Sequence, residues 1–197
     1  MKEFIAVLVL IFSFQSWTKA DDIREFQIEG LSLGDSLLDY YSEEEIKNKS
    51  DPSIATFYEN KFIAIWFDSF SLENYDDLAV TYKIKDNKYK IHEIKGTLDF
   101  HNNIKKCIKK RDKIIKEISS LFKNAKKDDP GKRNYGPDPS GKSKTYSVYF
   151  YTKDEGYIEV SCYDVTNELY KKNGWRDALV VNIGSKEFRN FLFQHYK

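Results

Sequence analysis

Motifs for catalysis and for metal binding are almost absent from this chain of 197 residues. The three histidines, His92, His101 and His195, lie far apart and form no H-x-H or H-x-x-x-H pair, so the sequence predicts no metal site. No G-x-S-x-G motif marks a hydrolase nucleophile. Carboxylate pairs such as Asp76 and Asp77 fall in predicted loops, where they are ordinary surface chemistry. We therefore expect no catalytic residues and no cofactor.

An excess of charge of one sign is also lacking. The chain has 32 Lys and Arg against 31 Asp and Glu, a net charge of +1. A general nucleic-acid-binding protein would carry a basic surplus, so we expect no nucleic-acid partner. The longest apolar run, Phe4 to Phe14, is shorter than the about 20 residues that a membrane-spanning helix needs. We therefore expect no stable membrane insertion.

The first residues do carry a targeting pattern. The stretch MKEFIAVLVLIFSFQSWTKADD has a short polar start, an apolar centre and a small-x-small ending at Thr18-Lys19-Ala20. It predicts a secretory signal peptide over residues 1–20, cut after Ala20. No cysteine near that cut could take a lipid anchor. We expect residues 21–197 to form a single α+β domain in the periplasm or outside the cell.

Cysteine is scarce, with Cys107 and Cys162 alone. An even count in an exported protein suggests a disulfide. Cys107 falls on the apolar stripe of a predicted helix over 102–124, and Cys162 shares a strand face with Ile158 and Val160. Both side chains would thus point at the core, where a bridge between helix and sheet is plausible. Two free buried thiols are the alternative.

The hydrophobic periodicity predicts the order helix, three strands, helix, three strands, helix. Ser32 with Asp35 and Ser42 with Glu45 have capping-box spacing, and residues 61–100 form a predicted three-stranded meander. This order predicts an α+β fold, with helices on one face of an antiparallel sheet and a helix at the C-terminus.

A faint repeat joins FQIEGLSLGDSLLDYY to HEIKGTLDFHNNIKKC, with Gly30 corresponding to Gly96. It suggests two α-β-β-β units sharing one sheet, with halves 21–100 and 101–197. Chance similarity is the alternative, because few positions match.

One face of the predicted helix over 102–124 is basic. It carries six lysines, interrupted by Asp112 and Glu117: Lys105, Lys106, Lys109, Lys110, Lys113 and Lys116. Such a face is most often the solvated side of a helix packed on a core. It is also the kind of face that docks on anionic lipid or on an acidic partner.

The stretch GPDPSGKS, Gly136 to Ser143, fits the G-x-x-x-x-G-K-[ST] pattern of a phosphate-binding loop. A working loop leaves a strand and enters a helix, whereas this one follows a helix and precedes a strand. Pro137 and Pro139 remove two backbone donors. We interpret the match as chance, predict no nucleotide site, and expect a flexible loop over 125–143.

Tyrosines supply the best positive indication of function. In TYSVYFYT, Tyr149 and Tyr151 would face away from Val148 and Phe150, beside Tyr157 and Tyr163 of the next strand. A tyrosine-rich sheet face is a candidate binding surface for protein, peptide or glycan, because tyrosine combines contact area with a polar tip. The alternative is that the C-terminal helix or another element covers this face.

A resemblance rests on several of these stretches together: the exported N-terminus, IEGLSLGDSLLDYYSEEEI, the helix carrying Cys107, DPSGKS, IEVSCYD and SKEFRNFL. They resemble a group of small secreted proteins of marine alphaproteobacteria to which no activity is assigned. The helix-then-strands order also looks like the periplasmic modules that include the outer-membrane assembly lipoprotein BamE and the β-lactamase inhibitor proteins. The chain departs from the BamE pattern in lacking a lipid-attachment cysteine.

Two hypotheses of function follow. The first is a non-enzymatic periplasmic binding or scaffold module that contacts a protein or other macromolecule through the tyrosine face or the 125–143 segment. The second is a periplasmic hydrolase with an unfamiliar site under the 125–143 loop. The partner of the first would be another periplasmic protein.

Overall fold

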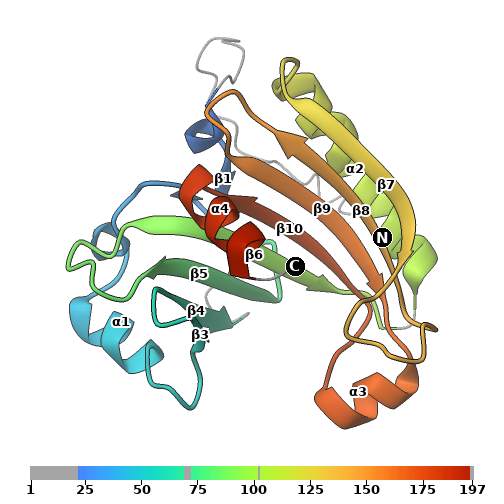
Figure 1. Cartoon of the computed structure of the whole chain (residues 1–197), viewed down its shortest axis with the longest axis horizontal. Coiled ribbons are helices and arrows are strands. Elements are labelled where there is room, and N and C mark those ends of the chain that lie inside the picture. Colours follow the sequence, from blue (N-terminus) through green and yellow to red (C-terminus); the bar gives the residue numbers. More distant parts are fainter. Residues whose placement is uncertain (1–21, 69–71, 102, 196–197) are drawn as a thin grey trace, which may run out of the picture.

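The computed structural model describes residues 22–68, 72–101 and 103–195 (Figure 1). The predicted signal peptide, residues 1–20, lies outside these ranges. The described chain forms one eight-stranded antiparallel sheet and a two-stranded sheet, with helices packed against the larger one. The predicted α+β class, antiparallel sheet and C-terminal helix are confirmed.

The large sheet consists of two four-stranded meanders that meet at its centre. Its strand order is β3-β4-β5-β6-β10-β9-β8-β7, and every neighbouring pair is antiparallel. The strands are β3 (Thr56–Tyr58), β4 (Phe62–Asp68), β5 (Asp77–Lys83), β6 (Ile91–Asp99), β7 (Lys126–Asn134), β8 (Lys144–Tyr151), β9 (Tyr157–Asp164) and β10 (Ala178–Gly184).

A helix precedes each meander, α1 (Glu43–Lys49) the first and α2 (Ile104–Leu121) the second. The described chain therefore repeats one helix and four strands, where the sequence predicted one helix and three, and the second set also has the helix α3 (Asn167–Asn173) between β9 and β10. The proposed match of Gly30 with Gly96 does not follow this repeat. Gly30 lies between β1 (Gln27–Ile28) and β2 (Leu31–Ser32), whereas Gly96 lies inside β6.

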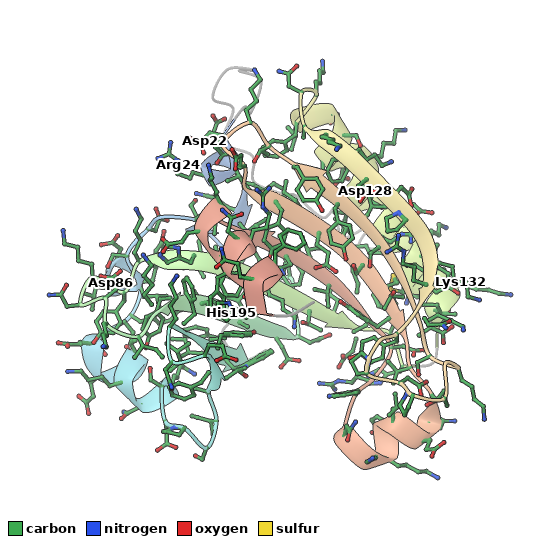
Figure 2. The ribbon with its side chains drawn as sticks, viewed as in Figure 1. Asp22, Arg24, Asp86, Asp128, Lys132 and His195 are labelled. Carbon is green, nitrogen blue, oxygen red and sulfur yellow. A yellow bond between two sulfur atoms is a disulfide. The ribbon has the colours of Figure 1, made fainter. Side chains whose placement is uncertain are left out.

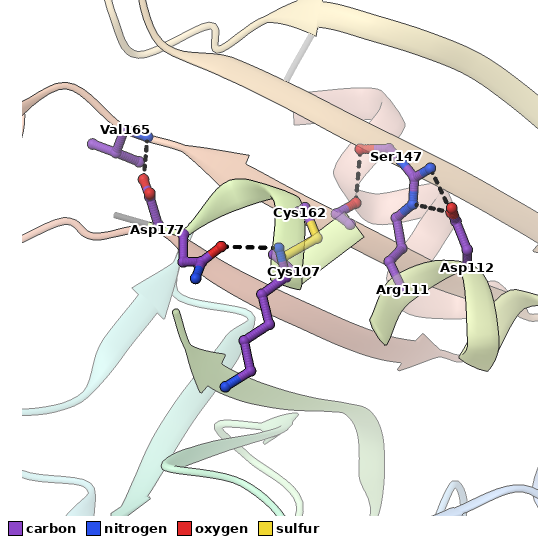
Figure 3. The surroundings of a disulfide bond; sticks show 10 residues. Cys107, Arg111, Asp112, Ser147, Cys162, Val165 and Asp177 are labelled. Carbon is purple, nitrogen blue, oxygen red and sulfur yellow. Dashed lines mark hydrogen bonds and ion pairs between the residues drawn. A yellow bond between two sulfur atoms is a disulfide. The ribbon is translucent and has the colours of Figure 1, made fainter. Parts of the chain in front are cut away.

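The helix α2 covers one face of the second meander. Cys107, Ile115 and Ile118 are its buried residues, and it packs against β9 and β10. Cys107 forms a disulfide with Cys162 of β9, at a Cα–Cα distance of 6.0 Å (Figure 3). The predicted bridge between helix and sheet is confirmed, because both cysteines lie on the faces that the periodicity assigned to the core.

The C-terminal helix α4 (Lys186–His195) covers the opposite face, in front of β6 and β10 (Figure 1). Its Phe188 and Phe191 pack on Phe62 of β4, with ring centroids 5.1 Å from the Phe62 ring in both cases. Phe62 alternates with Ile63, which belongs to the main core on the α2 side. The helices are thus divided between the two faces rather than gathered on one.

The strand β5 is buried on both faces, although its sequence alternates large apolar residues with Ala79 and Thr81, a pattern typical of a half-buried strand. Ala79 and Thr81 are 3% and 0% exposed. Thr81 Oγ1 donates to Glu93 Oε2 at 2.7 Å, and Ala79 lies in register between Trp66 and Lys95. Longer side chains on the neighbouring strands therefore cover the small ones of β5.

The first half of the segment expected to be a loop over 125–143 is a strand. Residues Lys126–Asn134 form β7, which pairs with β8 at the edge of the sheet. Its register shifts between Asp128 and Gly131, and Gly131 has φ +68°. An irregularity at an edge accommodates Pro130, which has no N–H to donate.

The spacing of Ser32 and Asp35 does not mark a helix. Asp35 Oδ2 accepts a hydrogen bond from Ser32 N, but Ser32 belongs to β2. The short 3₁₀ helix η2 (Leu37–Asp39) begins after Ser36 instead. Among the described residues, no helix combines the length and the apolar character that crossing a membrane requires.

Candidate binding face

The four predicted tyrosines share one face of the sheet, opposite to the disulfide. Tyr149 pairs with Glu159 across β8 and β9, and Tyr151 pairs with Tyr157. Glu159, Ser161 and Tyr163 are alternate residues of β9, so their side chains point to the same face. The structure thus brings these rings to one face, but it places each of them in different surroundings.

Tyr157 lies in a buried polar network. Its ring covers Gly184 so closely that a Cβ on that glycine would come within 2.6 Å of Tyr157 Cζ. Its hydroxyl donates to Glu93 Oε1 at 3.2 Å, and Asn182 Nδ2 donates to the same oxygen at 3.0 Å. Burial raises the pKa of both Tyr157 and Glu93. Tyr157 therefore helps to hold the fold and is not an accessible contact.

Tyr151 lies beside α4. The Arg189 guanidinium sits 5.7 Å from the centre of the Tyr151 ring. Arg189 and Lys186 both reach Glu155 in the turn between β8 and β9, at 3.4 and 3.0 Å. The alternative that the C-terminal helix covers the tyrosine face thus holds for the end of the face that carries Tyr151 and Tyr157.

Tyr149 and Tyr163 surround Glu159 on the part of the face beyond α4. Glu159 Oε1 lies 2.5 Å from Ser161 Oγ and accepts from the Tyr163 hydroxyl at 3.4 Å. Burial and the Glu159 carboxylate together raise the pKa of Tyr149 to about 12. The Glu159 charge is also the main cause that raises the pKa of Tyr163. All three side chains are half-buried, so each keeps a surface that a partner can contact.

Glu159 belongs to a row of side chains that crosses most of the sheet. In cross-strand register, the row runs through Trp66, Ala79, Lys95, Asn182, Glu159 and Tyr149. Trp66 is 39% exposed, and Lys95 Nζ lies 5.6 Å from the centre of its ring. An aromatic ring therefore stands at each end of the row, with charged and polar groups between them.

A second group of aromatic rings extends the face beyond Tyr163. The Tyr135 ring lies 5.5 Å from Tyr163 and 5.7 Å from Trp175, measured between centroids. Trp175 is 38% exposed. Sequence reasoning missed both Trp66 and Trp175. Trp66 could have been predicted to face away from the core, because it alternates with the core residues Ile65 and Phe67. Trp175 lies outside any strand, so alternation could not indicate its position.

The GPDPSGKS stretch is the connection between β7 and β8, so it links two strands and no helix follows it. Asp138 organises this connection. Its carboxylate accepts from Ser140 and from the backbone N–H of Ser143, and these bonds lower its pKa. The loop atoms that would face a phosphate in a working phosphate-binding loop are thus arranged around an acidic side chain, which would repel one.

Elsewhere in the described structure, the candidate ligand and metal sites are weaker. A shallow depression of about 420 Å³ is lined by Lys83, Lys85, Asp86, Lys90, His92 and Glu187. Lys83 already pairs with Glu187 at 2.8 Å, and burial lowers the pKa of His92. Within the described residues, no three His, Cys, Asp or Glu side chains are grouped so that they could hold a metal ion.

In comparisons with protein-family models, curated proteins and solved structures, nothing matches the chain.

Proposed function

We propose that the protein is a periplasmic or secreted binding module that recognises another protein, without catalysis, through the sheet face around Glu159. The observation that carries the proposal is the Glu159 carboxylate, held between Ser161 and Tyr163 and flanked by Tyr149. These groups stand on paired strands, so little ordering is required when a partner binds. Tyrosine and tryptophan are the residues that most often dominate protein interfaces.

The extent of the row favours a protein surface over a small ligand. From Trp66 to Tyr149 the row crosses β4, β5, β6, β10, β9 and β8. Ala79 and Asn182 are buried within it, so its accessible members are Trp66, Lys95, Glu159 and Tyr149. At about 4.8 Å per strand this is a span of about 24 Å. A contact of that length matches the side of a protein interface, whereas a small-molecule site is concave and encloses its ligand. We expect a basic group of the partner to meet Glu159.

The disulfide supports the location. Such bonds persist in oxidising compartments and are rare in the cytosol. Cys107 and Cys162 are both 0% exposed, so their pairing contributes to the core rather than to surface redox chemistry.

The hydrolase hypothesis required residues 125–143 to form the roof of a cleft. Residues 126–134 instead extend the sheet as β7, and Asp138 is engaged by Ser140 and Ser143. These contacts favour the binding hypothesis over the hydrolase hypothesis.

A photo-crosslinking residue at position 149 tests the proposal in an extract of the exported proteins of the native cell. The matched control places the same residue at Tyr170, a tyrosine of α3 (Asn167–Asn173) that is 54% exposed and outside the face. We expect one protein to be captured reproducibly at position 149 and not at position 170. Equal capture at both positions, or none at 149 from a folded protein, would overturn the proposal.

A further inference from the structure

The charges of the chain are strongly segregated. Residues 105–133 contain twelve Lys and Arg against four Asp and Glu, a net charge of +8. The whole chain has a net charge of +1, so the remaining residues carry −7. A near-neutral total thus hides one strongly basic segment, which consists of α2, β7 and their connection.

The lysines of α2 form one continuous face. At about 100° per residue, the six lysines named above fall within an arc of about 140°. Cys107, Ile115 and Ile118 lie on the opposite side of the helix, buried against the sheet. With 18 residues the helix is about 27 Å long. The arc is therefore a straight basic surface directed away from the core.

The strand β7 adds two lysines on the same side of the sheet. Lys127 pairs with Phe150 and Lys132 pairs with Tyr146, and both aromatic residues belong to the core that α2 covers. Paired residues of antiparallel strands point to the same face. Lys132 lies at the edge of the sheet (Figure 2), with Nζ 5.7 Å from the centre of the Tyr146 ring.

Few acidic groups neutralise this surface. Asp112 pairs with Arg111 at 2.7 Å, and Glu117 lies 3.9 Å from Lys113. Among the described residues, no salt bridge joins an acidic group to Lys105, Lys106, Lys109, Lys110 or Lys116. Five positive charges on α2 are thus left without a partner inside the described molecule.

We propose that the α2 lysine arc, together with Lys127 and Lys132, docks the protein on the surface of an anionic lipid bilayer. The charge complementarity and the straight length of the arc fit a plane of phosphate headgroups, which attracts exposed lysines one by one. The arc holds lysine and no arginine, so it lacks the forked donors and the ring stacking by which proteins usually hold nucleic acids. This proposal does not depend on the function proposed for Glu159, which lies on the other face of the sheet.

Vesicle co-sedimentation tests the proposal with three full-length proteins. The first is the parent, the second is K105Q/K109Q/K116Q, and the third is the control K88Q/K171Q/K172Q. The control loses the same charge from exposed lysines outside the arc. Glutamine keeps helix propensity close to that of lysine. Any contribution of residues 1–20 is common to all three proteins, and circular dichroism verifies that each is folded.

We expect the parent to bind vesicles with about 30% phosphatidylglycerol and to be released as NaCl is raised from about 0.1 to about 0.5 M. Each arc lysine contributes about fivefold to the partition coefficient, so the arc variant should bind about a hundredfold more weakly while the control matches the parent. Equal weakening by the two variants would overturn the proposal. So would failure of the parent to bind, or arc-dependent binding to nucleic acid or to an acidic protein without binding to vesicles.

Discussion

Glu93 is a buried carboxyl whose position depends on an irregularity of β6. Thr81 pairs with Glu93 and Tyr82 with Ile91, which leaves His92 as an extra residue in the ladder. A bulge of this kind turns two consecutive side chains to the same face. His92 accordingly packs on Phe62, with ring centroids 5.3 Å apart, while Glu93 enters the network with Thr81, Tyr157 and Asn182. Simple alternation over β6 could not predict this pair.

Substituting Glu93→Gln should change how stability depends on pH. Burial raises the folded-state pKa of Glu93 above its usual 4.5, so its carboxyl contributes most to stability below about pH 4.5. That contribution is lost as pH rises through the folded-state pKa. Glutamine has no charge to bury, so the free energy of unfolding of Glu93→Gln does not decrease in this way. We therefore expect the free energy of unfolding of Glu93→Gln, relative to the parent, to increase with pH by at most about 1.4 kcal/mol per unit.

Urea unfolding at several pH values between about 4 and 8 measures this difference. A matched control is Glu44→Gln, an exposed glutamate in the first turn of α1. A difference between parent and Glu93→Gln that stays constant across the range would show that Glu93 is ionised in the fold at no cost.

At the scale of the element, α1 shows how much a local pattern can predict. Ser42 and Glu45 form a complete capping box, with Glu45 N donating to Ser42 Oγ and Ser42 N donating to Glu45 Oε2. Ser32 and Asp35 have the same spacing, but Gly34 (φ +91°) and the β1–β2 hairpin impose another backbone path there. Spacing alone therefore identifies the cap, and the chain around it decides whether a helix follows.

Replacing Ser42 by alanine should destabilise the protein by about 1 kcal/mol, because it removes the acceptor for Glu45 N and frees the Glu45 side chain. Thermal unfolding of Ser42→Ala measures the loss. Ser120→Ala, an exposed change within α2, should leave the midpoint nearly unchanged because alanine favours helix. Similar midpoints for Ser42→Ala and the parent would mean that the capping box adds nothing.

The strand β7 could not be predicted from the hydrophobic pattern of the sequence. Its sequence KKDDPGKRN contains no apolar residue, so no alternation predicts a strand. It forms because β8 offers a free ladder edge, and its lysines and Pro130 suit the outermost position of a sheet. The pairing of β7 with β8 therefore could not be predicted from the composition of β7.

At the scale of the whole molecule, the sheet and the shared face of the four tyrosines could be predicted from local periodicity, and the disulfide from the even cysteine count together with that periodicity. The division of the helices between two faces could not. It depends on Phe62 alternating with Ile63, so that one strand offers an apolar anchor to each side. The packing of α4 on Phe62 then decides which tyrosines stay accessible, which no single segment reveals.

The disulfide links α2 to the second meander, and its cysteines are separated by 55 positions in the sequence. Replacing both cysteines in Cys107→Ser/Cys162→Ser should lower the free energy of unfolding by about 2 to 4 kcal/mol, because the unfolded chain regains the freedom of a long loop. Reducing agent should destabilise the parent by a similar amount and leave the double variant unchanged. If the double variant unfolded at the same midpoint as the oxidised parent, the disulfide would contribute nothing to the free energy of unfolding.

The affinity of the partner captured at position 149 tests the central claim most directly, namely that the face around Glu159 binds a protein. It would be measured for the parent, Tyr149→Ala, Glu159→Gln and the control Tyr170→Ala. We predict that the first two variants bind at least about tenfold more weakly, as residues at the centre of an interface do, and that the control binds like the parent. The same affinity in all four folded proteins would contradict the claim.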